Sequence, residues 1–136
     1  MSLDEDVIRL ARGADLATVV TLMPDGQPQA QLTWIDTDEE HVLVNTEPQR
    51  QRCRNLERDP RTILIHGEDP WDWPEVRGEV ARTIHGQRAR DHIDALAQKY
   101  LGTDYQNPIG PEGRVILQIA PRKINTSARL FGRTTQ

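Results

Sequence analysis

The chain has 136 residues and a formal net charge of -4, so it is long enough for one domain with its own core and too short for two. The negative balance argues against a general nucleic-acid-binding protein, because such proteins usually present a strongly basic surface. No apolar run approaches the roughly 18 to 20 residues of a membrane helix, and the acidic start MSLDEDVIRL differs from the basic start of a secretory signal. With a single cysteine, the sequence predicts one cytoplasmic domain over residues 1–136 that binds neither nucleic acid nor a membrane.

The first part of the chain is predicted to contain one helix and three antiparallel strands. Apolar periodicity, β-branched runs and an Asp-Gly turn place the helix at residues 3–12 and the strands at 17–22, 29–36 and 41–46. In the second strand Ala30, Leu32 and Trp34 alternate with polar residues, which predicts one apolar and one polar face. The three strands are expected to form an antiparallel meander.

The rest of the chain is predicted to contain two more helices and three more strands. In chain order these are a helix at residues 48–58, strands at 61–67 and 75–83, a helix at about 87–101 and a strand at 113–121. Residues 122–136 receive no prediction. Because strands and helices do not alternate as in βαβ units, the order favours a mainly β fold, an antiparallel barrel with peripheral helices.

Arginines gather where the strand at residues 41–46 meets the following helix. Arg50 and Arg52 are two residues apart, so they would point to the same side if the backbone there is extended. Asn45 and Thr46, at the end of the strand, could add neutral hydrogen bonds. A helix N-terminus beside guanidinium groups is typical of a phosphate site. The spacing alone also fits a solvated helix face, because nearby carboxylates could pair with these charges.

Other reactive residue types form no recognisable pattern. The four histidines lack the spacing of a metal site. Cys53 lies in the arginine-rich helix without a recognisable histidine partner, so a packed residue is expected rather than a nucleophile. The sequence therefore predicts no metal site and identifies no catalytic residue.

Several of these segments together resemble a known group of proteins. The strand 42-VLVNT-46, the arginine pair, 54-RNLERDPR-61 and 75-EVRGEV-80 resemble the flavin/deazaflavin oxidoreductase superfamily, whose members are pyridoxamine 5′-phosphate oxidase-like split β-barrel proteins. The likeness is closest to the actinobacterial branch that uses coenzyme F420, and it covers about residues 17–121. It implies a six- to seven-stranded antiparallel split β-barrel with peripheral helices.

The resemblance also implies cofactor-binding residues. Arg50 and Arg52 match the two basic positions that hold the cofactor's phosphate. The further residues that match cofactor contacts are Asn45 and Thr46 near the phosphate and Gln31, Leu32 and Thr33 on the strand beside the ring. Trp73, in a loop that also carries Trp71, is expected to close over the cofactor or to lie at a dimer interface, although both rings could simply cap the barrel.

The function that the resemblance implies is F420-dependent oxidoreduction. A hydride would pass from reduced coenzyme F420 to a small electron-poor organic acceptor, in a homodimer with its cofactor at the subunit interface. FMN is the alternative cofactor, and use of FAD or haem stays open. A protein that binds its cofactor without turnover, as a carrier, is the non-enzymatic alternative.

Overall fold

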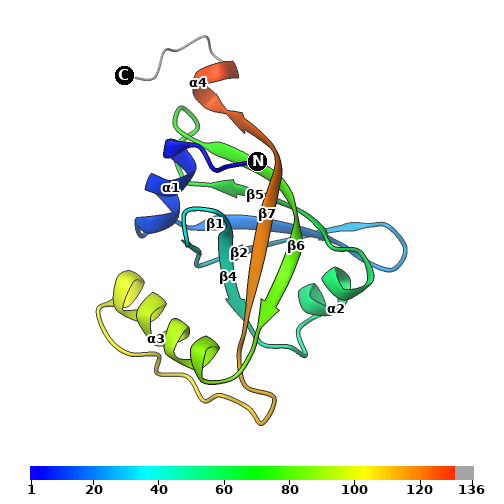
Figure 1. The fold of residues 1–136 in the computed structure, drawn as a ribbon, viewed down its shortest axis with the longest axis vertical. Helices are drawn as coiled ribbons and strands as arrows, with labels where there is room; N and C mark the ends of the chain where they lie inside the picture. The colour runs from blue at the N-terminus through cyan, green and yellow to red at the C-terminus, as the bar shows by residue number, and fades with distance from the viewer. Residues whose placement is uncertain (131–136) are drawn as a thin grey trace.

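The structure, a computed structural model, describes residues 1–130 and is mainly β, as predicted. Within these residues the strands are β1 (Ala17–Leu22), β2 (Pro28–Thr33), β3 (Asp36–Thr37), β4 (Val42–Thr46), β5 (Arg61–His66), β6 (Pro74–Ile84) and β7 (Val115–Thr126). The helices are α1 (Glu5–Arg12), α2 (Gln51–Arg58), α3 (Gln87–Leu101) and α4 (Ser127–Leu130). Figure 1 shows α1 and α3 on one side of the long strands. It shows α2 on the other side, near the turn of the β1–β2 hairpin.

All seven strands join in one antiparallel sheet with the order β2-β1-β5-β6-β7-β4-β3. Strands β6 and β7 are the longest and pair along their whole lengths, with register shifts between Arg77 and Gly78 and between Val80 and Arg82. Such bulges increase local twist and bend a strand, which lets a long pair curve. This single curved antiparallel sheet, flanked by helices, confirms the predicted mainly β fold.

Two predicted features of the topology are wrong. The first three predicted strands do not form a meander, because β4 pairs with β7 and β3 while β2 pairs with β1. The strand predicted at residues 113–121 is longer, since β7 runs to Thr126 and α4 follows it. Of the C-terminal segment without a prediction, residues 131–136 lie outside the described part of the chain.

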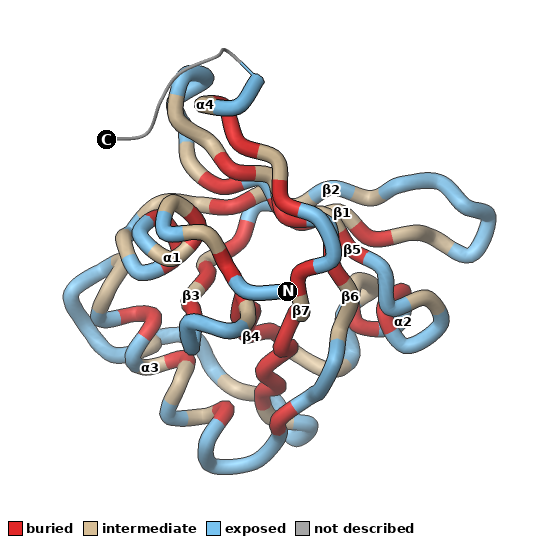
Figure 2. The backbone as a smooth tube through the Cα atoms, turned by 45° about the horizontal axis from the view of Figure 1, so that its top comes forward, coloured by how far each residue is buried: buried red, intermediate tan, exposed pale blue. Residues whose placement is uncertain are grey.

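The core lies between the sheet and its helices. Buried stretches follow β4 and β7, while much of the outer surface of the helices is exposed (Figure 2). Val7 and Ala11 of α1 pack into the main cluster, and Ala89 of α3 belongs to a smaller cluster at the other end. The sheet therefore has a covered face that carries α1 and α3.

The two faces predicted for β2 are present, and the apolar one lies on the outside. Ala30 and Leu32 are exposed, whereas Gln29 and Gln31 are partly buried and Thr33 is buried. β2 is an edge strand, and the side that it turns toward the helices is its polar side. Its apolar side consequently lies on the outer surface of the sheet.

Helix α2 is attached to the β1–β2 hairpin through one buried amide. Asn55 Nδ2 donates to Thr21 Oγ1 at 3.0 Å, and Asn55 Oδ1 accepts from Gln51 Nε2 at 2.9 Å. Asn55 is fully buried, so these bonds satisfy a polar group that would otherwise be costly. The attachment holds α2 against β1.

Candidate functional site

The sheet and α3 enclose a pocket of about 290 Å³ at the point where β4 ends and α2 begins. Its walls come from β2, β4, α2, α3 and the segment that joins α3 to β7. The lining residues are Leu16, Leu32, Thr33, Trp34, Asn45, Arg52, Ile93, Tyr105, Asn107 and Arg114.

The pocket brings together half of the residues that the sequence proposed for a cofactor site. Leu32, Thr33, Asn45 and Arg52 line it. The others, Gln31, Thr46, Arg50 and Trp73, are not among its lining residues. The end of β4 and the start of α2 therefore meet at one pocket.

Arg52 is held at the edge of the pocket by a buried hydroxyl group. Its Nε donates to Oγ1 of Thr46 at 2.9 Å, and Thr46 is fully buried. Burial also lowers the pKa of Arg52. Among residues 1–130, no acceptor meets the two terminal nitrogens of this guanidinium. Thr46 thus orients Arg52 and leaves donors available to a ligand.

Arg50 occupies a different position from Arg52. Because α2 begins at Gln51, Arg50 is the N-cap and Arg52 already lies in the first helical turn, so the two do not share one extended stretch. Arg50 is exposed and its Nη2 donates to Oε1 of Glu47 at 3.0 Å. In the single chain, Arg50 lies outside the pocket and Arg52 lies inside it.

The second cation that lines the pocket is Arg114, which the sequence reasoning missed. It directly precedes β7 and is buried, with 8% of its surface exposed. Its Nε donates to Oδ1 of Asn45 at 2.9 Å, and its Cζ lies 5.2 Å from the centre of the Tyr105 ring. Burial lowers the pKa of Arg114 as well. Tyr105 and Asn107 were also missed, because they lie in a Gly/Pro/Asn-rich segment without periodicity.

Both polar groups of the Asn45 side chain make hydrogen bonds within the protein. Its Nδ2 donates to the carbonyl of Ala89 at 2.9 Å and lies 3.1 Å from Nδ1 of His92, while Oδ1 accepts from Arg114. His92 Nε2 in turn lies 3.1 Å from Oδ2 of Asp36. Asn45 therefore connects β4 to α3 and to the start of β7.

Trp34 forms the wall of the pocket beyond β2, and Tyr100 supports it from behind. Trp34 stacks on Tyr100 with ring centres 5.2 Å apart and an interplanar angle of 7°. The Tyr100 hydroxyl donates to the carbonyl of Asp15 at 2.6 Å and accepts from the amide of Ile35 at 3.1 Å. These contacts fix the link between β2 and β3, and with it the indole that faces the pocket.

Trp73 lies at a second hollow rather than at this pocket. Its Nε1 donates to the carbonyl of Pro70 at 2.9 Å, and it lines the second hollow together with Ile65 and Arg77 on the outer side of the sheet. Trp71, in the same loop, is 54% exposed. Within one chain, neither tryptophan reaches Arg52.

The chemistry of the pocket is amphipathic and cationic. Two guanidinium groups line it, and none of the described residues that line it carries a carboxylate. Leu32, Trp34 and Ile93 provide apolar surface beside them. Such a lining fits a ligand with a flat apolar ring and an anionic group. A volume of about 290 Å³ lies at the lower end of the range for small-molecule sites, about 300 to 1,000 Å³, so it suits one part of a large cofactor.

Other candidate chemistry finds no support within residues 1–130. No group of three or more His, Cys, Asp or Glu side chains there is arranged to hold a metal ion. Cys53 is buried, and burial raises the pKa of its thiol. None of the helices in this part of the chain has the length and apolar content needed to cross a membrane.

Comparison with known proteins adds three observations of similarity. A sequence profile described as pyridoxamine 5′-phosphate oxidase matches residues 3–128. A solved structure named F420 reductase is 25% identical, with a TM-score of 0.74 over 90% of this chain and 98% of that one. A conserved hypothetical protein of Mycobacterium tuberculosis is 23% identical, with a TM-score of 0.69 over 98% and 91% of the two chains.

The same fold also occurs in a protein with a different printed role. The haem storage protein HutZ of Vibrio cholerae is 11% identical, with a TM-score of 0.63 over 93% of this chain and 95% of that one. At this identity the likeness concerns the fold alone.

Proposed function

The chain belongs to the pyridoxamine 5′-phosphate oxidase family, and from that premise we propose that it is an F420-dependent oxidoreductase. It transfers a hydride from reduced coenzyme F420 to a small electron-poor organic acceptor. The observation that carries this proposal is the pocket at the β4–α2 junction, with cationic groups at one part and apolar side chains at another. The similarity to an F420 reductase favours F420 over FMN.

The residues of the pocket have distinct tasks in this proposal. Arg52 binds the phosphate of the coenzyme through its two terminal nitrogens, which have no hydrogen-bond acceptor among residues 1–130. Thr46 orients Arg52. Leu32 and Thr33 of β2 border the ring, and Trp34 limits the space beyond them. Arg50 lies at the rim, where it adds positive potential offset by Glu47.

The protein's contribution to the reaction is position and electrostatics. The chemistry supplied by the bound coenzyme is a hydride, which with one proton from solvent reduces the acceptor by two electrons. The described residues that line the pocket include no histidine, cysteine or carboxylate, and a proton from solvent is sufficient for this chemistry. The apolar wall at Leu32 and Trp34 excludes water from one side of the ring.

We further propose that the protein acts as a homodimer with the cofactor at the subunit interface. The outer face of the β2-β1-β5 part of the sheet carries two rows of mainly apolar residues, because the register aligns Leu32 with Thr18 and Ile65, and Ala30 with Val20 and Ile63. Leu32 is 67% exposed and Ile65 is 42% exposed, and such exposure of large apolar side chains on one sheet face is typical of an interaction surface. A hollow of about 410 Å³ on the same face has a predominantly apolar lining that includes Val20 and Ile63.

A second copy is the occupant that this face fits best. Leu32 belongs both to the outer face and to the pocket, so a partner packed there would also close the open side of the pocket. The rim of the face carries both signs of charge, with Arg77 paired to Glu75 and Arg122 paired to Glu79. A surface with both signs can meet itself across a two-fold axis. Trp73, beside Ile65, would then come close to the partner's cofactor.

Sedimentation equilibrium at micromolar concentrations tests the dimer. We expect a dimeric wild type and monomeric Leu32→Glu and Ile65→Glu variants, because each change buries a carboxylate in the interface. Leu101→Glu is the matched control, since Leu101 is 62% exposed on α3 and outside this face. A monomeric wild type, or a dimer that both face variants retain, would remove the proposal.

Titration with candidate cofactors tests which one the protein binds. F420, FMN, FAD and haem are titrated into the protein, and F420 is expected to bind most tightly, in the micromolar range. Arg52→Gln should weaken F420 binding about 10- to 100-fold, the value of one charge-assisted contact. Arg54→Gln is the control, because Arg54 is exposed on the same helix.

Reoxidation distinguishes an enzyme from a carrier. Reduced F420 bound to the protein is mixed with quinone and other electron-poor acceptors, and its absorbance is followed. Acceleration over free reduced F420 is the expected result for an enzyme. Tight binding without acceleration by any acceptor would favour the carrier alternative.

A further inference from the structure

The cationic side of the pocket contains a buried network that the proposed function does not yet use. We infer that Arg114 is a second anion-binding residue of the pocket, and that Asp36, His92 and Asn45 position its guanidinium through consecutive hydrogen bonds. The choice of a phosphoryl group as its ligand rests on the proposed function. The positioning itself follows from contacts within the chain.

Arg114 is unusually buried for an arginine that borders a pocket. Only 8% of its surface is exposed. Its Nε donates to Asn45 Oδ1 at 2.9 Å, its Nη2 reaches the Asn45 carbonyl at 3.4 Å, and the Tyr105 ring lies against it. Among residues 1–130 its carboxylate partner is Glu47, at 3.4 Å from Nη1, and Glu47 also accepts from Arg50 and from Gln49. Burial of a guanidinium costs free energy when its carboxylate partner is shared with other donors, and a bound anion would offset that cost.

Arg52 and Arg114 together make this side of the pocket suitable for a phosphoryl group. Burial lowers the pKa of Arg52, and the positive charges of Arg50 and Arg114 lower it further. Burial and the charge of Arg50 lower the pKa of Arg114. Glu47 relieves part of this repulsion for both arginines, but it is not among the described residues that line the pocket. A phosphoryl group has several oxygens that can accept from two planar forks at once.

The hydrogen bonds around Asn45 have one consistent direction. Because Oδ1 accepts from Arg114, Nδ2 must be the group that donates to the Ala89 carbonyl and to Nδ1 of His92. Nδ1 of His92 is then an acceptor, and the proton sits on Nε2, which donates to Asp36 Oδ2 at 3.1 Å. Reversal of the amide would place donor against donor at Arg114 and acceptor against acceptor at Ala89.

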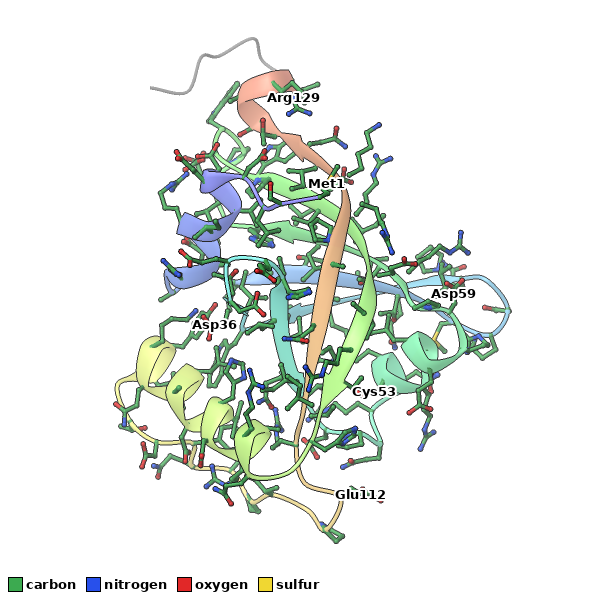
Figure 3. The ribbon with its side chains drawn as sticks, viewed as in Figure 1. Met1, Asp36, Cys53, Asp59, Glu112 and Arg129 are labelled. Atoms are coloured by element: carbon green, nitrogen blue, oxygen red, sulfur yellow. The ribbon has the colours of Figure 1, made fainter. Side chains whose placement is uncertain are left out.

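This chain of contacts joins three separate parts of the fold. Asp36 lies on β3 and is labelled in Figure 3, above α3, while His92 lies on α3 and Asn45 on β4. Burial alone would raise the pKa of Asp36, but hydrogen bonds from His92 and a backbone amide outweigh it, so the pKa is lowered and the charged form is favoured. The charged carboxylate fixes the imidazole, the imidazole fixes the amide, and the amide fixes Arg114. A guanidinium held in this way loses little conformational entropy when an anion binds.

The binding test uses F420 and a double-mutant cycle. Arg114→Gln should weaken F420 binding about 10- to 100-fold. His92→Leu should weaken it about 5- to 10-fold in the wild-type background and less than about 2-fold when Arg114→Gln is also present. His92→Asn should restore most of the loss, because its Oδ1 can accept in place of Nδ1. Arg90→Gln, on the same helix and paired with Asp94 at 2.8 Å, is the control that should leave binding unchanged.

A second measurement uses the wild-type protein and inorganic phosphate, so that it does not depend on folding of the variants. In protein labelled with ¹⁵N-arginine, titration with phosphate should shift the Nε resonances of Arg52 and Arg114 saturably and together. The Arg90 resonance should stay in place. If F420 fails to bind while phosphate shifts both resonances, the inference stands and the choice of cofactor is wrong.

Three results would overturn the inference. One is F420 binding that depends on Arg52 and is unchanged in Arg114→Gln, which would leave the proposed function intact. Another is a phosphate titration that moves Arg52 alone or neither arginine. The third is an effect of His92→Leu of equal size in both backgrounds, without rescue by His92→Asn, because that pattern indicates a structural role only.

Discussion

A buried histidine in the core predicts a specific sensitivity to acid. His66 is fully buried at the end of β5, and neither ring nitrogen has a hydrogen-bond partner among residues 1–130. Burial lowers the pKa of His66 from 6.5 to about 4. The imidazole is therefore neutral in the folded protein at pH values where the unfolded chain already binds a proton.

The sign and size of the effect follow from this difference. Stability is fully present above the unfolded pKa of 6.5 and is lost as the pH falls toward the folded pKa of about 4. A separation of roughly 2.5 units corresponds to a loss of about 3 kcal/mol in the free energy of unfolding, of which about 2 kcal/mol is gone at pH ~5. His66→Leu removes the titrating group, and at neutral pH it should be neutral or slightly stabilising, because it replaces an unsatisfied polar ring with an apolar side chain.

Urea unfolding of wild type and His66→Leu between pH 7.5 and about 4.5 measures this directly. The difference in unfolding free energy between the two proteins should widen in favour of the variant as the pH falls, by about 2 kcal/mol at pH ~5. His85→Gln is the matched control, since His85 is exposed, and it should follow the wild-type curve. Parallel curves for wild type and His66→Leu would refute the reasoning, because they would mean that His66 is protonated equally easily in both states.

Three further substitutions test the packing of the fold. Gly78→Ala should lower the free energy of unfolding by about 1 to 3 kcal/mol, because the added Cβ would overlap the carbonyl oxygen of Ala120. Gly110→Ala is the control and should be neutral, because a Cβ there meets open space among the described residues. Thermal unfolding compares the two variants. Asn55→Leu should cost about 1 to 3 kcal/mol in urea unfolding, because it leaves the β1 hydroxyl beneath α2 unpaired; an unchanged midpoint would mean that α2 is held otherwise. Tyr100→Phe should cost about 1 kcal/mol or somewhat more, since a backbone carbonyl and an amide each lose a partner, and unchanged stability would indicate that water replaces the hydroxyl group.

The secondary structure was largely predictable because local signals agree with the tertiary contacts. The Asp-Gly turn closes the β1–β2 hairpin, and α3 spans the predicted residues, Gln87–Leu101. The long partner of β6 was less predictable. The apolar run at residues 115–120 indicated a strand, but its continuation to Thr126 depends on pairing with β6, which begins more than forty residues earlier in the chain.

The orientation of β2 shows what a period of two can and cannot determine. Alternation identified the strand, but it does not say which side faces the helices. The apolar side, with Ala30 and Leu32, lies outward in the single chain. If a second copy covers that face, as we propose, the sequence pattern describes an interface rather than the interior of one protomer.

The site was predictable only where its residues are close together in the sequence. Asn45 and Arg52 flank one strand-to-helix junction, and both line the pocket. Arg114 lies 69 residues from Asn45, its hydrogen-bond partner, and the sequence around it is that of an ordinary strand start. Arg50, chosen for its spacing, differs from Arg52 because the helix begins between them.

A crystal structure of the protein grown with F420 tests the central claim most directly. The account predicts the coenzyme in the pocket at the β4–α2 junction, with a phosphate oxygen within hydrogen-bonding distance of the terminal nitrogens of Arg52 and the ring beside Leu32. Coenzyme bound at another surface, with Arg52 facing water, would contradict it.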